Sequence, residues 1–329
     1  MFRVAVACFL LIALFMSEVS FAQQAEPFAV WLQKVEADSV AAGINPMVVK
    51  SALSSVEFDE QVIELDRRQP ESTISFNAYS RGVITPNRVK RGSALLQAHA
   101  ELLRKISDRY GVPPEMMIAL WGVESSFGNS TGNFNILNSL ATLGYDGRRS
   151  EFFRGELISA LQILDHNQQN PSDLLGSWAG AIGQCQFLPS TYIKYAVDYD
   201  GDGRRDIWSS DGDVLASISN YLVAEGWQRG LTWGREVKLT KTISSSLVGV
   251  EQKHLLKEWS NLGVVGKNGK PLPARQVKAS LVQPDGPHGR SFLVYDNFRV
   301  LMRWNRSTYF ATAIGLFSDQ IKTTSVKRR

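Results

Sequence analysis

The run Trp121-Gly122-Val123-Glu124-Ser125-Ser126-Phe127-Gly128 places a carboxyl group on the apolar side of a predicted helix. Two prolines just before the run favour a first helical turn and Gly128 favours an end, so we expect a helix over residues 113–128. Residues three and four positions apart share a helix face, which groups Glu124 with Met117, Leu120 and Trp121.

An apolar environment disfavours the charged form of a carboxyl group and should raise the pKa of Glu124. A general acid needs this property, because it must still hold its proton near neutral pH. The competing interpretation is an ordinary solvated glutamate, which is the commonest state of this residue type on helices.

Three motifs resemble those of one enzyme family: the run around Glu124, the segment Ala141-Thr142-Leu143-Gly144-Tyr145-Asp146-Gly147-Arg148-Arg149, and the segment Ala179-Gly180-Ala181-Ile182-Gly183-Gln184-Cys185-Gln186-Phe187-Leu188-Pro189-Ser190. The family is that of the lytic murein transglycosylases, of the membrane-bound lytic transglycosylase B type, in the lysozyme-like superfamily. The resemblance extends from about Phe28 to about Asp319. It implies a mainly α (α+β) fold, with a lysozyme-like catalytic core, an N-terminal helical subdomain and a small β insertion.

Periodicity and this resemblance together predict the organisation of the chain. The expected parts are a signal peptide (1–22), an N-terminal helical subdomain (23–85), a lysozyme-like core with a calcium loop (86–230), a small β-containing subdomain (231–296), C-terminal helices that close the cleft (297–322) and a basic tail (323–329).

The N-terminal segment has the features of a secretory signal peptide. One Arg precedes an apolar stretch from Val4 to Met16, and small residues end at Ala22, where we expect cleavage. Cys8 lies too early to serve as a lipoprotein anchor, so we expect a periplasmic protein without membrane association. Cys185 would then be the one remaining thiol, which excludes an internal disulfide.

The charge pattern argues against a nucleic-acid partner. The net charge is only +4, and no long basic tract is interleaved with aromatic residues. Peptidoglycan glycan strands are the partner that the resemblance implies. Partners in a wall-synthesis complex stay open, and no organic cofactor is expected.

The resemblance implies cleavage of the β-1,4 bond between N-acetylmuramic acid and N-acetylglucosamine, which leaves a 1,6-anhydromuramoyl end. Hydrolytic glycosidases usually need two carboxylates, and spacing assigns no partner to Glu124. A lytic transglycosylase can use one Glu as acid and then as base, because the substrate's own hydroxyl is the nucleophile. The alternatives are a lysozyme-type hydrolase and a non-catalytic, calcium-stabilised wall-binding scaffold.

The same resemblance implies the substrate contacts. Ser177 and Gln186 would lie near Glu124 and orient the sugar, while Tyr79, Tyr145 and Tyr221 would offer stacking surfaces. Three further residues fall where the family closes its cleft: Asn297, a candidate substrate contact, Arg303 and Trp304. Arg299 and Trp304 stand in a region where relatives often carry Tyr.

The segment Asp198-Tyr199-Asp200-Gly201-Asp202-Gly203-Arg204-Arg205-Asp206 has the spacing of a calcium loop. Asp198, Asp200, Asp202 and the backbone of Arg204 would supply oxygen ligands. Ser209 occupies the position of the usual closing Glu, and an expanded loop closed by Asp213 would agree with the family. A structural Ca²⁺ is therefore expected, with an Asp/Gly-rich surface turn as the alternative.

Two local expectations concern the segment that follows the Glu124 helix. Residues 133–143 are predicted to form an irregular turn region. Arg148 and Arg149 start the next helix, where positive charge is unfavourable, so either they pair with a carboxylate or they form a solvated pair.

Overall fold

The computed structural model describes residues 26–68 and 74–326 of the chain. The predicted signal peptide and the end of the predicted basic tail, Lys327 to Arg329, lie outside these ranges. Residues 323–326 belong to the last helix rather than to a tail. None of the helices in the described ranges combines the length and the apolar character needed to cross a bilayer.

Helices make up most of the described chain, as expected for a mainly α (α+β) fold. The helices are α1 (Phe28–Ala41), α2 (Pro46–Leu53), α3 (Glu60–Arg67), α4 (Phe76–Val83), α5 (Pro86–Ala98), α6 (Ala100–Tyr110), α7 (Pro114–Ser125), α8 (Ile136–Tyr145), α9 (Ser150–Asn167), α10 (Pro189–Tyr195), α11 (Asp211–Ala224), α12 (Leu256–Asn261), α13 (Asp296–Trp304) and α14 (Thr308–Val326). The strands are β1 (Phe134–Asn135), β2 (Leu175–Gly176), β3 (Gly234–Leu239), β4 (His254–Leu255), β5 (Val264–Gly266), β6 (Lys278–Val282) and β7 (Ser291–Val294).

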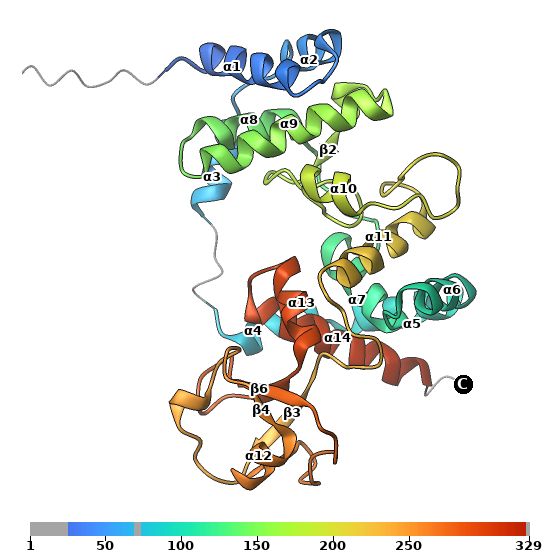
Figure 1. The fold of residues 1–329 in the computed structure, drawn as a ribbon, viewed down its shortest axis with the longest axis vertical. Helices are drawn as coiled ribbons and strands as arrows, with labels where there is room; N and C mark the ends of the chain where they lie inside the picture. The colour runs from blue at the N-terminus through green and yellow to red at the C-terminus, as the bar shows by residue number, and fades with distance from the viewer. Residues whose placement is uncertain (1–25, 69–73, 327–329) are drawn as a thin grey trace, which may run out of the picture.

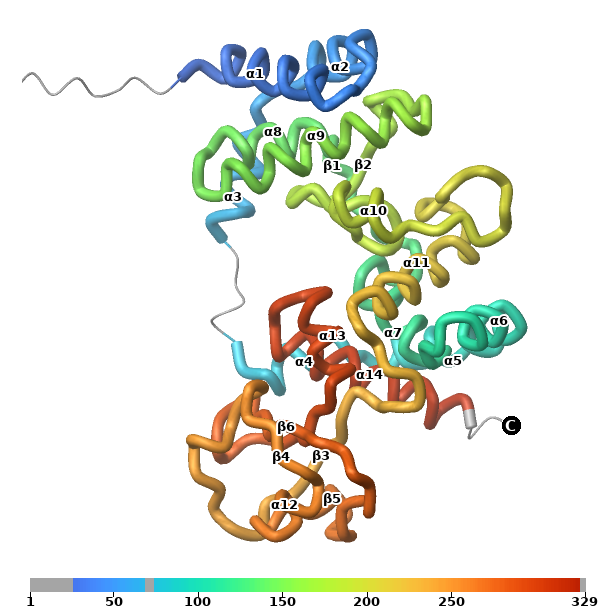
Figure 2. The backbone as a smooth tube through the Cα atoms, in the orientation of Figure 1, coloured from blue at the N-terminus to red at the C-terminus, as the bar shows by residue number. Residues whose placement is uncertain are grey.

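The molecule is elongated, with helices along most of its length and the larger sheet, together with α12, at one end (Figure 1). Helices α1 and α2 lie at one end, followed by α8 and α9, and the sheet lies at the other end beyond α13 (Figure 2). One large apolar core runs from Trp31 in α1 to Ile321 in α14, and a second, smaller core fills the β region around Trp259. The helical elements on both sides of α7 therefore share one core.

The predicted β insertion is a five-stranded antiparallel sheet with the strand order β4-β6-β7-β3-β5. Strand β7 has four buried residues in a row, consistent with a central strand covered on both faces. Trp259 of α12 is fully buried against the sheet, and its Nε1 donates a hydrogen bond to the Ala279 carbonyl oxygen at 2.9 Å.

The prediction of an irregular turn over residues 133–143 is wrong, because α8 covers most of it. Asn135 caps this helix by accepting a hydrogen bond from Asn138 N at 3.1 Å. Nearly every residue from Ile136 to Gly144 is buried. Asn138, Ser139 and Thr142 within the helix have low intrinsic helix propensity, and burial of the helix in the core overrides that preference.

The two arginines before α9 pair with a carboxylate, as one of the two interpretations predicted. Nη2 of Arg148 and Nη2 of Arg149 donate hydrogen bonds to Asp66 Oδ1 at 2.9 and 3.0 Å. Asp66 lies in α3 and is only 4% exposed, so the arginines compensate a buried charge. The pair therefore ties α3 to the start of α9.

Candidate active site

Glu124 lies in the last turn of α7, a helix buried on nearly all sides. The turn after it is tight, because Ser126 and Phe127 both adopt left-handed backbone conformations, with φ of 51° and 59°. Phe127 folds back over the helix so closely that a Cβ on Gly122 would lie 2.5 Å from its ring. Strained backbone of this kind persists where surrounding packing enforces it, and here it ends the helix directly beside Glu124.

The Glu124 side chain is partly exposed, and its carboxyl group accepts one hydrogen bond from an aromatic residue far along the chain. Trp304 Nε1, at the end of α13, donates to Glu124 Oε1 at 2.7 Å. Loss of hydration raises the pKa of Glu124 from the usual 4.5 to about 7, against a smaller lowering by the Trp304 hydrogen bond. The apolar helix face thus has the effect on the Glu124 pKa that the sequence predicts.

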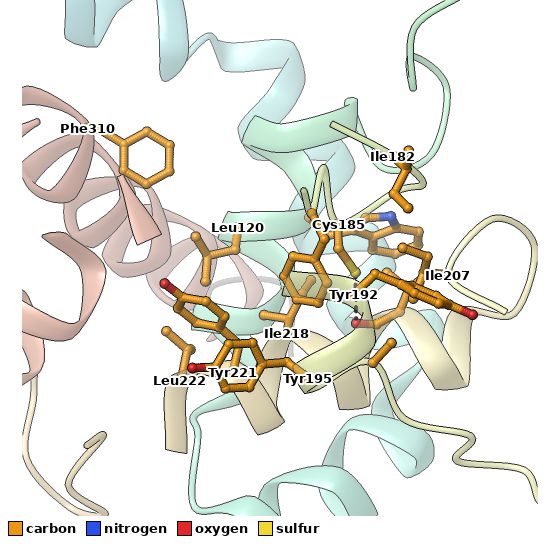
Figure 3. Close-up of a cluster of buried hydrophobic side chains, with 14 of the residues drawn as sticks. Leu120, Ile182, Cys185, Tyr192, Tyr195, Ile207, Ile218, Tyr221, Leu222 and Phe310 are labelled. Carbon is orange, nitrogen blue, oxygen red and sulfur yellow. Dashed lines mark hydrogen bonds between the residues drawn. The ribbon is translucent and has the colours of Figure 1, made fainter. Parts of the chain in front are cut away.

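Aromatic side chains support Trp304 from behind. The ring centroid of Tyr221 lies 4.7 Å from that of Trp304, and the ring centroid of Phe187 lies 5.3 Å away. Tyr221 is only 9% exposed and packs beside Tyr195 in the core cluster with Leu120 and Cys185 (Figure 3). The expectation that Tyr221 offers a sugar-stacking surface is therefore corrected: its ring is a packing partner of Trp304.

The small-residue segment that contains Ser177 and Gln186 folds against the loop after α7. A Cβ on Gly132 would lie 2.0 Å from the Gly176 carbonyl oxygen, so backbone meets backbone here, as the composition predicts. Ser177 Oγ accepts a hydrogen bond from Ala181 N at 3.0 Å. Gln186 Nε2 donates to the carbonyl oxygens of Thr131 and Gly183, both at 2.9 Å. Both side chains are partly exposed.

Two other predicted substrate contacts, Tyr79 and Tyr145, lie in different surroundings. Tyr79 of α4 is partly exposed, with its ring centroid 5.8 Å from that of Tyr309. Tyr145 does not join the Glu124 group: its ring packs against Phe28, Trp31 and Phe58, and its hydroxyl donates to the Glu26 carbonyl oxygen at 2.5 Å.

Asn297 is corrected from a substrate contact to a structural residue. It is fully buried, and its Nδ2 donates to the carbonyl oxygens of Gln228 and Leu231 at 3.0 and 2.7 Å. Its Oδ1 accepts from Gln228 N at 2.7 Å. The amide is thus committed to the chain segment that leads from α11 to the β region.

The predicted metal residues separate into two groups. Asp198, Asp200 and Asp202 gather carboxylate oxygens that lie within 4.8 Å of one another. Asp213 is not part of this group, because it is fully buried and its two oxygens accept hydrogen bonds from Tyr199 N at 2.8 Å and Asp206 N at 2.7 Å. Asp213 closes the loop through the backbone instead of joining the oxygen cluster.

Two side chains at or beside the site had no predicted role. The sequence placed Trp304 near the cleft, but nothing in it revealed the hydrogen bond to Glu124, which joins residues 180 positions apart. Gln184 is buried and accepts from Trp121 Nε1 at 2.7 Å while donating to the Trp208 carbonyl oxygen at 2.7 Å. Nothing in the sequence set Gln184 apart from Gln186, two residues further along the same small-residue segment.

Comparison with known proteins gives consistent matches over this whole region. Residues 27–319 match the family described as the transglycosylase SLT domain. The chain is 31% identical over 288 residues to the membrane-bound lytic murein transglycosylase B of Escherichia coli K12, covering 83% of this chain and 77% of that protein.

Solved structures agree with these sequence matches. SltB3 from Pseudomonas aeruginosa, in complex with NAG-anhNAM-pentapeptide, has a TM-score of 0.86 and 44% identity, covering 90% of this chain and 80% of that chain. The Escherichia coli lytic transglycosylase Slt35, in complex with calcium, has a TM-score of 0.78 and 30% identity, covering 90% of this chain and 93% of that chain. The chain therefore belongs to the transglycosylase SLT domain family, the peptidoglycan lytic transglycosylases of lysozyme-like fold.

Proposed function

We propose that this enzyme cleaves the β-1,4 bond between N-acetylmuramic acid and N-acetylglucosamine and leaves a 1,6-anhydromuramoyl end, with Glu124 as the acid and then the base. The observation that carries the proposal is the raised pKa of Glu124, which keeps this partly exposed carboxyl protonated up to about pH 7. SltB3 was solved in complex with NAG-anhNAM-pentapeptide, which carries an anhydromuramoyl group and so favours the same chemistry here.

In the first step, Glu124 donates its proton to the glycosidic oxygen while the bond to the muramoyl C1 breaks, and an oxocarbenium-like sugar forms. In the second step, the Glu124 carboxylate takes the proton from the C6 hydroxyl of the same sugar, whose oxygen bonds to C1. Proximity favours this internal hydroxyl over a water molecule. The proton returns to Glu124, so the enzyme ends the cycle in its starting state.

The surroundings of Glu124 support a mechanism with one carboxylate. Among the described residues, burial and the Trp304 hydrogen bond are the two causes that set its pKa, and no acidic side chain contributes. A glycosidase that activates water generally needs a second carboxylate about 5 to 9.5 Å from the first. None of the described acidic side chains is hydrogen-bonded to Glu124, and the NAG-anhNAM-pentapeptide bound to SltB3 favours the single-residue mechanism here.

Ser177, Gln186 and Tyr79 are the proposed substrate contacts. Each is partly exposed, and Gln186 is anchored to the loop that follows α7. Ser177 and Gln186 would orient the acetamido and hydroxyl groups of the sugar, and Tyr79 would contact a sugar face. The C-terminal helices α13 and α14 would close the same cleft, since α13 carries Trp304.

We further propose a structural Ca²⁺ in the loop of residues 198–206. The clustered oxygens of Asp198, Asp200 and Asp202 match the hard ligands that calcium prefers, with the Arg204 carbonyl as a fourth. Asp198 already curls the loop by accepting from Gly201 N and Gly203 N at 2.7 and 2.9 Å. Binding would stabilise the segment between α10 and α11 and would take no part in the chemistry.

We place the enzyme in the periplasm, exported by a cleavable signal peptide at residues 1–22. Residues 23–85 would then form the first helical part of the mature enzyme, 86–230 the core with Glu124, 231–296 the β part and 297–322 the closing helices. Glycan strands of peptidoglycan are the proposed partner, consistent with the fragments bound to SltB3.

Mass spectrometry of the products released from purified peptidoglycan tests the proposed function. Residues 23–329 should release muropeptides that end in anhydromuramoyl groups, and Glu124→Gln should release none. Reducing ends would mean a hydrolase. Binding without release by both proteins would mean a scaffold, and undiminished release by Glu124→Gln would remove Glu124 as the acid.

A further inference from the structure

The hydrogen bond from Trp304 distinguishes the two oxygens of Glu124. An indole N–H can donate but cannot accept, so the oxygen that it contacts at 2.7 Å must be an acceptor. In a protonated carboxyl group one oxygen carries the proton and the other is a carbonyl acceptor. The hydroxyl oxygen of a carboxylic acid is the weaker acceptor of the two, so the contact favours the carbonyl role for Oε1 and the proton on Oε2.

The indole is held in place by two independent sets of contacts. Its ring packs against Tyr221 and Phe187, with centroid distances of 4.7 and 5.3 Å. The preceding residue, Arg303, donates a hydrogen bond to the Glu225 carbonyl oxygen, and its Nε lies 3.7 Å from Glu225 Oε2. The end of α13 is thereby fastened to the end of α11, which limits rotation of Trp304 away from Glu124.

We propose that Trp304 is a positioning residue that keeps Oε1 of Glu124 as an acceptor throughout the reaction, so that Oε2 alone both delivers and recovers the proton. This inference rests on the proposed function. The Oε2 proton moves to the leaving glycosidic oxygen as the C1–O bond breaks. The C6 hydroxyl proton then moves to Oε2 as the new C1–O bond forms. No other reactant is needed.

Glu124 is the group in this cluster that titrates near neutral pH. Burial holds the pKa of Cys185, on one side, and of Tyr221, behind Trp304, well above their usual ranges, so both stay neutral. Asp213 lies near Cys185, while Glu225 and Arg303 face Tyr221 and form an ion pair. A signal from the Trp304 indole should therefore follow the Glu124 proton.

The first test is independent of activity and measures the indole ¹H–¹⁵N NMR signal of Trp304 between pH 5 and 9. The signal is assigned by its absence from Trp304→Phe. Hydrogen bonds to a charged acceptor are stronger, so the indole proton should shift downfield as Glu124 ionises, with a midpoint near pH 7. The shift should be absent from Glu124→Gln. A Trp304 signal that does not titrate in the wild-type enzyme would overturn the proposal.

The second test compares Trp304→Phe, which keeps an aromatic ring but loses the donor, with Trp304→Tyr, which restores a hydroxyl donor. We expect Trp304→Phe to lower kcat about ten- to a hundredfold, the equivalent of one hydrogen bond to a charged group, with little change in KM. In the wild-type enzyme the Trp304 hydrogen bond lowers the pKa of Glu124, so its loss should raise that pKa. The activity of Trp304→Phe should therefore persist to higher pH. Trp304→Tyr should recover part of both effects.

Trp259→Phe is the matched control, since it also removes an indole hydrogen bond from a buried site, in the β region. It should lower stability without moving the pH profile. If Trp304→Phe keeps the wild-type pH profile and kcat while Glu124→Gln is inactive, the role of Trp304 is refuted and the proposed function stands. Full turnover by Glu124→Gln would instead refute the proposed function from which this inference starts.

Discussion

Replacing Glu124 by Gln should stabilise the fold while it abolishes catalysis. The pKa of Glu124 is raised from 4.5 to about 7, so the native state holds this proton more tightly than the unfolded state does. At a pH between 4.5 and about 7, the Glu124 carboxyl is ionised in the unfolded chain but still protonated in the folded chain, which favours unfolding. The stability of the wild-type enzyme therefore falls as the pH rises from 4.5 to about 7, and the full cost is present above pH 7.

The pKa shift gives the size of this effect. It corresponds to about 3 kcal/mol at pH 8 and to less than about 1 kcal/mol at pH 5. A Gln side chain carries no charge to desolvate, and its amide oxygen can still accept the Trp304 hydrogen bond. Glu124→Gln should therefore gain about 2 kcal/mol more at pH 8 than at pH 5 relative to the wild-type enzyme.

Urea unfolding of both proteins at pH 5 and pH 8, followed by tryptophan fluorescence, measures this difference. Glu101→Gln on α6 is a suitable control, because the neighbouring Lys105 lowers the pKa of Glu101, so any pH-dependent change should have the opposite sign. Equal stabilisation of Glu124→Gln at the two pH values, or none at either, would show that the Glu124 carboxyl is not desolvated in the folded enzyme.

Three further results are expected. The rate of muropeptide release should fall as the pH rises through about 7, where Glu124 loses its proton, and a rate that still increases up to pH 9 would contradict the assignment of this acid. Calcium should raise the midpoint of thermal unfolding, by an amount equivalent to about 2.7 kcal/mol at a hundredfold excess over Kd. The double variant Asp200→Asn, Asp202→Asn should lose this gain in calorimetry and behave like the wild-type enzyme in EDTA, whereas the same calcium response in both proteins would exclude this site. Asn297→Ala should destabilise the fold by about 2–3 kcal/mol, because it leaves buried backbone groups of Gln228 and Leu231 without partners. An unaltered unfolding midpoint together with a raised KM would instead show that Asn297 contacts the substrate.

Local sequence patterns predicted the helix around Glu124 and the β region well. The prolines before α7, its apolar residues around Leu120, and the alternation of apolar and polar residues around Ala279 are each features of a short stretch of sequence. Strand β6 itself is buried on both faces. Helix α8 was missed because residues of low helix propensity, such as Asn138 and Thr142, are held in it by packing against the rest of the core. A sequence pattern read over a few helical turns could not indicate which other parts of the chain pack around α8.

The composition of the site depends on contacts that no local pattern encodes. The Trp304 to Glu124 hydrogen bond joins the ends of α13 and α7, and the role of Tyr221 follows from its packing against Trp304. Resemblance to the family identified the region but could not separate exposed side chains from buried ones. Asn297 and Tyr221 were assigned to the cleft for this reason, although both are buried.

The most direct test of the central claim is to run the reaction in water enriched in ¹⁸O and to measure the mass of the new muramoyl ends. Internal attack by the C6 hydroxyl predicts products without the label and lighter by one water than reducing ends, and their formation should require Glu124. Incorporation of one ¹⁸O atom at the muramoyl C1 would show that water is the nucleophile and would contradict the single-carboxylate mechanism.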